Sequence, residues 1–162
     1  MKKSSFIFLV LILSLTLVGC NFQNPRYINF SMKPNNHYYV DEIKNRILNN
    51  DKFTLYIFDT NLYKEVEVPP EDDNIIEDFF STLTSDTYTD EKTDANEPFR
   101  LKIVFNNNDK YLIKIFNDSI VSIAPWDGVY KEDTVSIKNL PLKYNLFDFC
   151  NHILNNPISK QN

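Results

Sequence analysis

The chain has 162 residues, of which 43% are apolar and 14% aromatic, and its formal net charge is −5. This length suits a single domain, whose aromatic residues suffice for a hydrophobic core without a metal or disulfide staple. The acidic balance argues against nucleic acid as a partner, because phosphate binding needs a surface rich in Lys and Arg. Two cysteines exclude a disulfide-dense scaffold, and two glycines exclude glycine-rich phosphate loops.

The first nineteen residues have the layout of an export signal. Lys2 and Lys3 precede an apolar run, Phe6–Val18. As a helix this run would reach about 20 Å, at about 1.5 Å per residue, which is short of the ~30 Å hydrocarbon core. We therefore predict a cleaved signal peptide at residues 1–19 rather than a membrane-spanning anchor.

The signal ends in Leu17-Val18-Gly19-Cys20, which resembles the lipobox of bacterial lipoproteins. In that family diacylglycerol is attached to the cysteine sulfur, and a dedicated peptidase cleaves before the cysteine. The resemblance implies that Cys20 is lipidated and that the bilayer is a partner through diacylglycerol on Cys20. It also places the mature protein on the outer face of the cell membrane, where two acyl chains give stable anchoring. The alternative is a chance cysteine after an ordinary signal peptide.

In length, composition and layout the chain resembles the small lipoproteins of low-GC Gram-positive bacteria of the clostridial type. Its asparagine runs, such as Asn106-Asn107-Asn108, are typical of such genomes. The resemblance implies an extracytoplasmic domain tethered to the membrane. We predict a lipidated N-terminus and tether at residues 20–36, a single domain at 37–157 and a tail at 158–162. An edge strand around Tyr27, Ile28 and Phe30 is the alternative for part of the tether.

The first half of the domain shows helical and strand patterns in turn. Apolar residues at helical spacing predict a helix over Val40–Asn49. Lys52–Phe58 is β-branched and aromatic, and Leu62–Val68 alternates apolar with polar residues, so the two predict a β-hairpin. After two prolines, a wide apolar stripe predicts a helix over Glu71–Thr84, with acidic residues at its positive end.

The second half begins with a polar, acidic segment, Ser85–Glu97, which we predict as a long loop. Three strand-like runs follow, Phe99–Phe105, Tyr111–Phe116 and Ile120–Ala124. Short connections between them favour an antiparallel meander, Val135 and Ile137 suggest a further edge strand, and Tyr144–Asn155 is predicted as the last helix. The fold class is therefore α+β, a two-layer sandwich of an antiparallel sheet with helices packed on one face.

The sequence indicates no catalytic residues, metal or other cofactor. His37 and His152 lie far apart in sequence, and no nucleophile stands beside either at a productive spacing. Cys150 falls on the apolar stripe of the last helix, so we predict a buried core residue. The acidic segment Ser85–Glu97 lacks the glycine and the alternation of an EF-hand, and we expect a solvated loop. A weak, irregular Ca²⁺ site is the alternative there.

Trp126, Asp127 and Tyr130 form the candidate binding site. The only tryptophan of the chain stands beside an Asp-Gly turn, where it can present an aromatic platform to a sugar or peptide. The alternative, which we favour on sequence grounds, is that Trp126 packs over an open end of the sheet and closes the core.

These features favour a binding or interaction module at the cell envelope, with an envelope protein, a peptide or a glycan as its partner. A structural or accessory subunit of a membrane complex is the alternative. We expect no enzymatic activity and no nucleic-acid partner.

Overall fold

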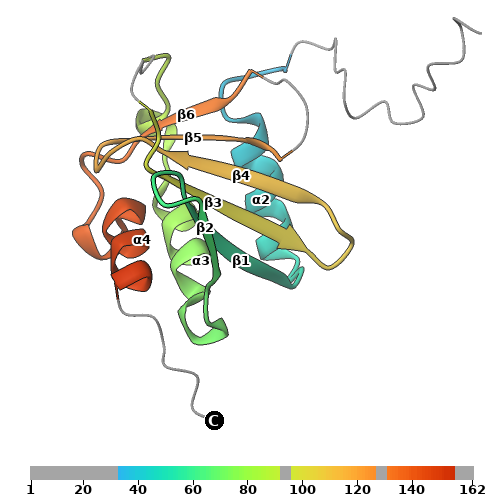
Figure 1. Cartoon of the computed structure of the whole chain (residues 1–162). Coiled ribbons are helices and arrows are strands. Elements are labelled where there is room, and N and C mark those ends of the chain that lie inside the picture. Colours follow the sequence, from blue (N-terminus) through green and yellow to red (C-terminus); the bar gives the residue numbers. More distant parts are fainter. Residues whose placement is uncertain (1–32, 92–95, 127–130, 156–162) are drawn as a thin grey trace, which may run out of the picture.

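The computed structural model describes residues 33–91, 96–126 and 131–155. One antiparallel sheet of six strands dominates it, in the order β2-β1-β3-β4-β5-β6 (Figure 1). The strands are β1 (Phe53–Asp59), β2 (Lys64–Glu67), β3 (Phe99–Phe105), β4 (Lys110–Ile115), β5 (Ile120–Pro125) and β6 (Asp133–Ser136). The predicted hairpin is therefore β1–β2, and the predicted meander with its edge strand runs from β3 to β6.

Three α-helices cover one face of this sheet (Figure 1). They are α2 (Tyr38–Leu48), α3 (Asn74–Thr82) and α4 (Leu146–Asn155). Their buried side chains pack with the inward-facing strand residues in one hydrophobic core. The predicted α+β class, with helices on one side of an antiparallel sheet, is confirmed. No helix among the described residues has the length and apolar character needed to cross a membrane.

Two helices begin later than the sequence pattern predicts. Pro70–Asp72 forms a 3₁₀ turn, η1, so α3 begins only at Asn74. Before α4, a second 3₁₀ turn, η3 (Leu142–Tyr144), places Asn145 at the helix start. The Asn145 side chain accepts a hydrogen bond from the Phe147 backbone N–H at 2.9 Å, which satisfies a donor that the helix leaves free. Apolar spacing does not show such boundaries, because both 3₁₀ turns lie before the first residue of the apolar stripe.

The predicted acidic loop is partly tied to the sheet. Its first residues form a 3₁₀ turn, η2 (Ser85–Thr87), and Tyr88 then makes an isolated antiparallel bridge with Val135. The Thr89 backbone N–H donates to the Thr134 carbonyl at 3.0 Å. We call residues 85–89 the strap, and it covers part of the outer edge of β6.

Strand register decides which side chains face the helices. Leu55 of β1 pairs with Ile103 of β3, and Ile103 pairs with Tyr111 of β4, and all three are buried in the core. Side chains alternate between the two faces along each strand. The even-numbered residues of β1, β3, β4 and β5 therefore lie on the opposite face, which we call the open face.

Cys150 lies on α4 and is fully buried, as predicted. Burial raises the pKa of its thiol, because the charged thiolate is disfavoured in an apolar environment. The side chain therefore serves packing.

Candidate functional site

The open face of the sheet carries aromatic and charged side chains, and no helix of the described part of the chain lies over it (Figure 1). Tyr56 and Phe58 project from β1, Arg100 and Lys102 from β3, Leu112 and Lys114 from β4, and Ser122 and Ala124 from β5. Trp126 follows β5, and its backbone N–H donates to the Lys110 carbonyl at 2.9 Å. This bond extends the β4–β5 ladder by one step and holds the indole beside the same face.

Lys102 stands between two aromatic rings at the centre of this face. Its Nζ lies 4.7 Å from the ring centroid of Tyr56 and 4.9 Å from that of Trp126. Both contacts are within the range of cation–π attraction, which comes from the electron-rich face of the ring. We call Tyr56, Lys102 and Trp126 the ring–ammonium cluster. Its side chains come from β1, from β3 and from the residue after β5, and they lie together on the open face.

Three cations of the central strands are paired with carboxylates. Lys102 Nζ lies 2.6 Å from Glu65 Oε2 of β2, and Lys114 Nζ lies 2.6 Å from Glu132 Oε1. Arg100 pairs with Glu97. The middle of the open face is thus a set of alternating donors and acceptors with little net charge.

A further aromatic side chain, that of Tyr63, extends the open face at the β1–β2 turn. Tyr63 has a positive φ of 50°, uncommon for a residue with a bulky side chain. Its ring contacts Phe58 edge to face at a centroid distance of 6.3 Å, while 85% of the side chain stays exposed. Backbone strain of this kind costs free energy, which indicates that the surrounding turn holds Tyr63 outward.

A hollow of about 570 Å³ adjoins the open face beside β6. Its lining includes Ser122, Glu132, Thr134, Lys33 and the strap residue Thr89. The Ser122 hydroxyl donates to Glu132, whose other oxygen holds Lys114. The hollow is therefore linked through Glu132 and Lys114 to the middle of the sheet.

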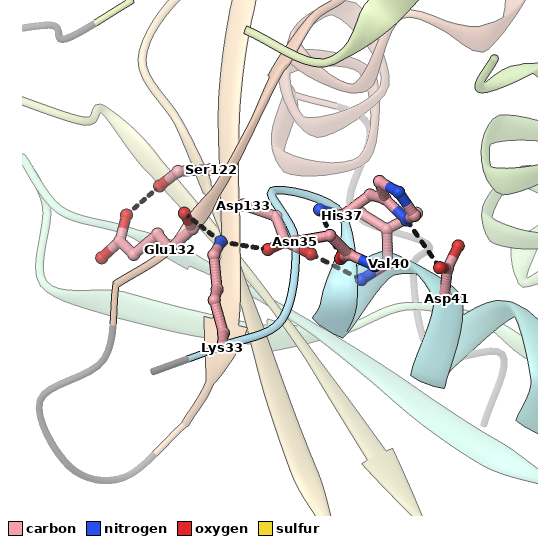
Figure 2. A network of polar contacts seen from close by, with 8 residues as sticks. All are labelled: Lys33, Asn35, His37, Val40, Asp41, Ser122, Glu132 and Asp133. Atoms are coloured by element: carbon pink, nitrogen blue, oxygen red, sulfur yellow. Dashed lines mark hydrogen bonds and ion pairs between the residues drawn. The ribbon is translucent and has the colours of Figure 1, made fainter. Parts of the chain in front are cut away.

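One wall of this hollow is fixed by a buried ion pair between Lys33 and Asp133 (Figure 2). The Lys33 side chain is 7% exposed, and the Asp133 side chain is fully buried. The other Asp133 oxygen accepts a hydrogen bond from the Val40 backbone N–H at 2.8 Å, in the first turn of α2. Burial raises the pKa of Asp133, and the Lys33 ammonium and the Val40 N–H oppose that shift. Contacts of the domain therefore extend back to Lys33, within the predicted tether.

His37 and Asp41 form a second polar pair at the start of α2 (Figure 2). His37 Nδ1 lies 2.6 Å from Asp41 Oδ2, and the imidazole packs against the Tyr88 ring at 5.0 Å. Both side chains are more than a third exposed. The pair joins α2 to the strap that covers β6, a structural role that its spacing of four residues on a helix supports.

Of the three residues of the predicted binding site, the structure describes only Trp126. Trp126 is 40% exposed and lies outside the hydrophobic core, so the expectation that it closes the core is wrong. The ladder bond to Lys110 places the indole on the open face, away from the helices. Asp127 and Tyr130 lie outside the described residues, as does Cys20, the predicted lipidation residue.

The ring–ammonium cluster and its carboxylate partner Glu65 were not predicted from the sequence. Tyr56, Glu65 and Lys102 are scattered over three strands, and only strand order and register bring them together. Alternation within β3 does place Lys102 opposite the core residues, and that signal could have marked it as surface. Within the described ranges, no group of three or more His, Cys, Asp or Glu is arranged to hold a metal ion.

A family model described as "Domain of unknown function (DUF4883)" matches residues 33–150. This match spans most of the chain and contains the whole sheet. The chain belongs to the DUF4883 family. The matched region begins at Lys33, the residue whose ion pair with Asp133 marks the start of the described domain.

Among solved structures, the chain is similar to "Putative Lipoprotein from Clostridium perfringens". The sequence identity is 28% and the TM-score is 0.69, with 76% of this chain and 99% of that chain covered. This similarity agrees with the resemblance to lipoproteins of the clostridial type. A comparison with functionally curated proteins gives no significant match.

Proposed function

We propose that this chain is a lipid-anchored binding module on the outer face of the cell membrane, and that it binds its ligand on the open face of its sheet. The observation that carries the proposal is the ring–ammonium cluster. Trp126 stays partly exposed there although it contacts Lys102, and Tyr56 lies on the other side of the same ammonium group. Exposed aromatic rings with fixed polar neighbours are typical of recognition surfaces.

Recognition suits this face better than catalysis does. Lys102 is held by Glu65, and Lys114 by Glu132, so the polar groups are already oriented by each other. Such preorganised donors and acceptors reduce the entropy cost of binding. Binding through these donors and acceptors requires no proton transfer. We therefore propose a binding protein without enzymatic activity.

Anchoring limits where the ligand can be. Thirteen residue steps separate Cys20 from Lys33, and a fully extended chain of that length reaches about 45 Å. Because the Lys33–Asp133 pair ties the end of the tether to the sheet, the domain samples only this zone above the membrane. We propose that its ligand is a component of the inner part of the cell envelope.

Replacement of Cys20 by Ser tests the anchor. We expect the Cys20→Ser chain to stay unprocessed or to be released from the membrane, because serine cannot carry the thioether-linked diacylglycerol. The measurement is partitioning of the full chain between detergent and aqueous phases, combined with its mass. Normal processing and full detergent partitioning of this variant would show that Cys20 is not the lipidation site.

Replacement of Trp126 by Ala tests the binding surface. We expect at least a tenfold loss of affinity for isolated clostridial cell wall, with unfolding free energy lowered by only about 0.5–1 kcal/mol because the indole lies outside the core. Cosedimentation of the full chain in detergent measures the binding, and urea unfolding measures the stability. The control is Leu142→Ala, which removes an exposed apolar side chain from η3, on the helix side.

Two results would contradict this proposal. Equal wall binding by wild-type and Trp126→Ala chains would show that the open face is not the binding surface. Failure of the wild-type chain to bind the wall would favour the alternative, a structural or accessory subunit of a membrane complex.

A further inference from the structure

We infer that the ligand of the open face is a glycan chain of two or more sugar residues. This inference rests on the proposed function and names the class of ligand for the same surface. It starts from the composition of the face, in which aromatic rings alternate with ion pairs that offer a donor and an acceptor side by side.

The chemistry of a sugar ring matches the ring–ammonium cluster. A pyranose presents C–H groups on its faces, and these pack against the electron-rich face of an aromatic ring such as Trp126 or Tyr56. Its hydroxyl groups both donate and accept hydrogen bonds. Lys102 and Glu65, 2.6 Å apart, supply one group of each kind beside the rings.

A second pair repeats this chemistry one strand away. Lys114 and Glu132 are also 2.6 Å apart, and the Ser122 hydroxyl bonds to the same carboxylate. Lys114 pairs with Arg100 in the β3–β4 register, two residues along from Lys102. Strand spacing and rise place the two positions about 8 Å apart. Beyond this pair lies the hollow beside β6, so the polar surface continues far enough for an extended ligand.

A peptide strand fits the open face poorly. Peptides that add to a sheet bond to the free main-chain groups of an edge strand. The open face is built from side chains, while its inner strands β1, β3, β4 and β5 are paired on both sides. The cluster therefore lies where main-chain recognition cannot operate.

A folded protein partner is disfavoured by the charges at the centre of the face. The cores of protein–protein interfaces are depleted in charged residues, which are kept for the rim. Here Lys102 and Lys114 occupy the two middle strands of the sheet. Covering them with an apolar partner would remove both ion pairs from water at a cost that their attraction does not repay.

An anionic membrane surface is disfavoured by the carboxylates. Lipid headgroups attract clusters of unpaired Lys and Arg. On the open face Glu65, Glu132 and Glu97 neutralise Lys102, Lys114 and Arg100, and the whole chain carries a net charge of −5. A ligand with many hydroxyl groups can donate hydrogen bonds to the carboxylate and accept them from the cation of each pair. The neutral, paired surface therefore suits such a ligand.

Titration with protein-free glycan tests the inference. The probe is the set of glycan fragments released by muramidase from protease-treated clostridial cell wall. Trp126 is the only tryptophan, so its emission reports on the cluster directly. We expect saturable binding by the wild-type full chain in detergent and at least tenfold weaker binding by Lys102→Met, which keeps the aliphatic stem and removes the ammonium.

Lys143→Met is the matched control. Lys143 Nζ lies 4.4 Å from the Tyr144 ring centroid, a similar contact in η3, on the helix side of the molecule. We expect this variant to bind glycan like the wild type. Equal loss in both variants would show a general charge effect and would overturn the inference.

Other outcomes separate this inference from the proposed function. If wall binding depends on Trp126 but the glycan fragments leave its emission unchanged, the open face binds something other than glycan, and only the inference fails. A change of Trp126 emission on phosphatidylglycerol vesicles without any response to glycan would assign the face to the membrane. Loss of wall binding after protease treatment of the wall would assign it to a protein.

Discussion

Replacement of Asp133 by Ala should destabilise the domain by about 3–5 kcal/mol, the range for breaking a buried ion pair. The Asp133 carboxylate holds Lys33 and accepts the Val40 N–H, and both partners are buried or nearly so (Figure 2). Removing it leaves an ammonium group at 7% exposure without its counter-charge and a helix donor without an acceptor. Urea unfolding followed by circular dichroism measures the change.

A double replacement separates the two contributions. Lys33→Met with Asp133→Leu removes both charges at once, so most of the loss should be recovered, because a buried pair often contributes little beyond an apolar pair of similar size. About 1 kcal/mol should remain, since Val40 still lacks its capping acceptor. The singly replaced chains Lys33→Met and Asp133→Leu are the references. If the loss of stability in the double variant equals the sum of their two losses, the residues are not coupled and the ion pair does not act as described.

The contribution of Asp133 to the stability of the domain depends on pH in a defined direction. Burial is the largest influence on this carboxyl and raises its pKa in the folded state. The folded chain then binds a proton at Asp133 more readily than the unfolded chain does. Its contribution to stability is therefore greatest below the unfolded pKa and declines as the pH rises through the folded pKa.

Replacement of Phe79 by Ala should cost about 3–5 kcal/mol, as deletion of a fully buried aromatic side chain does. Phe79 lies on α3 and has no exposed surface. Its ring meets that of Phe80 edge to face, with centroids 5.3 Å apart. The variant should unfold at lower urea concentration with an unchanged slope, because the same surface is exposed on unfolding.

Tyr63→Ala is the comparison for this prediction. Tyr63 has a similar size but is 85% exposed, so its removal should change stability by no more than about 0.5 kcal/mol. A cost below about 1 kcal/mol for Phe79→Ala would mean that α3 is not part of the main core.

The fold class and nearly every helix and strand can be predicted from the order of the residues. Strands such as Phe99–Phe105 carry an apolar residue at every second position, because one face is buried and the other is not. The helices show apolar stripes for the same reason, and the burial of Cys150 followed from its place on one of them. These features depend on local periodicity, which the chain carries in its residue order. The lipobox resemblance likewise depends on adjacent residues.

The surroundings of Trp126 and the start of the domain depend instead on contacts between residues far apart in the chain. Lys33 and Asp133 are 100 positions apart, and Lys102 is brought between Tyr56 and Trp126 by the order and register of the strands. The sequence placed Trp126 at a rim but could not choose between the core and the open face. The hydrogen bond from the Trp126 backbone N–H to the Lys110 carbonyl decides between them. It continues the pairing of β4 with β5, and this pairing sets the face of the sheet toward which Trp126 points. A shift of one residue would turn the indole to the other face, and no local pattern records such a shift.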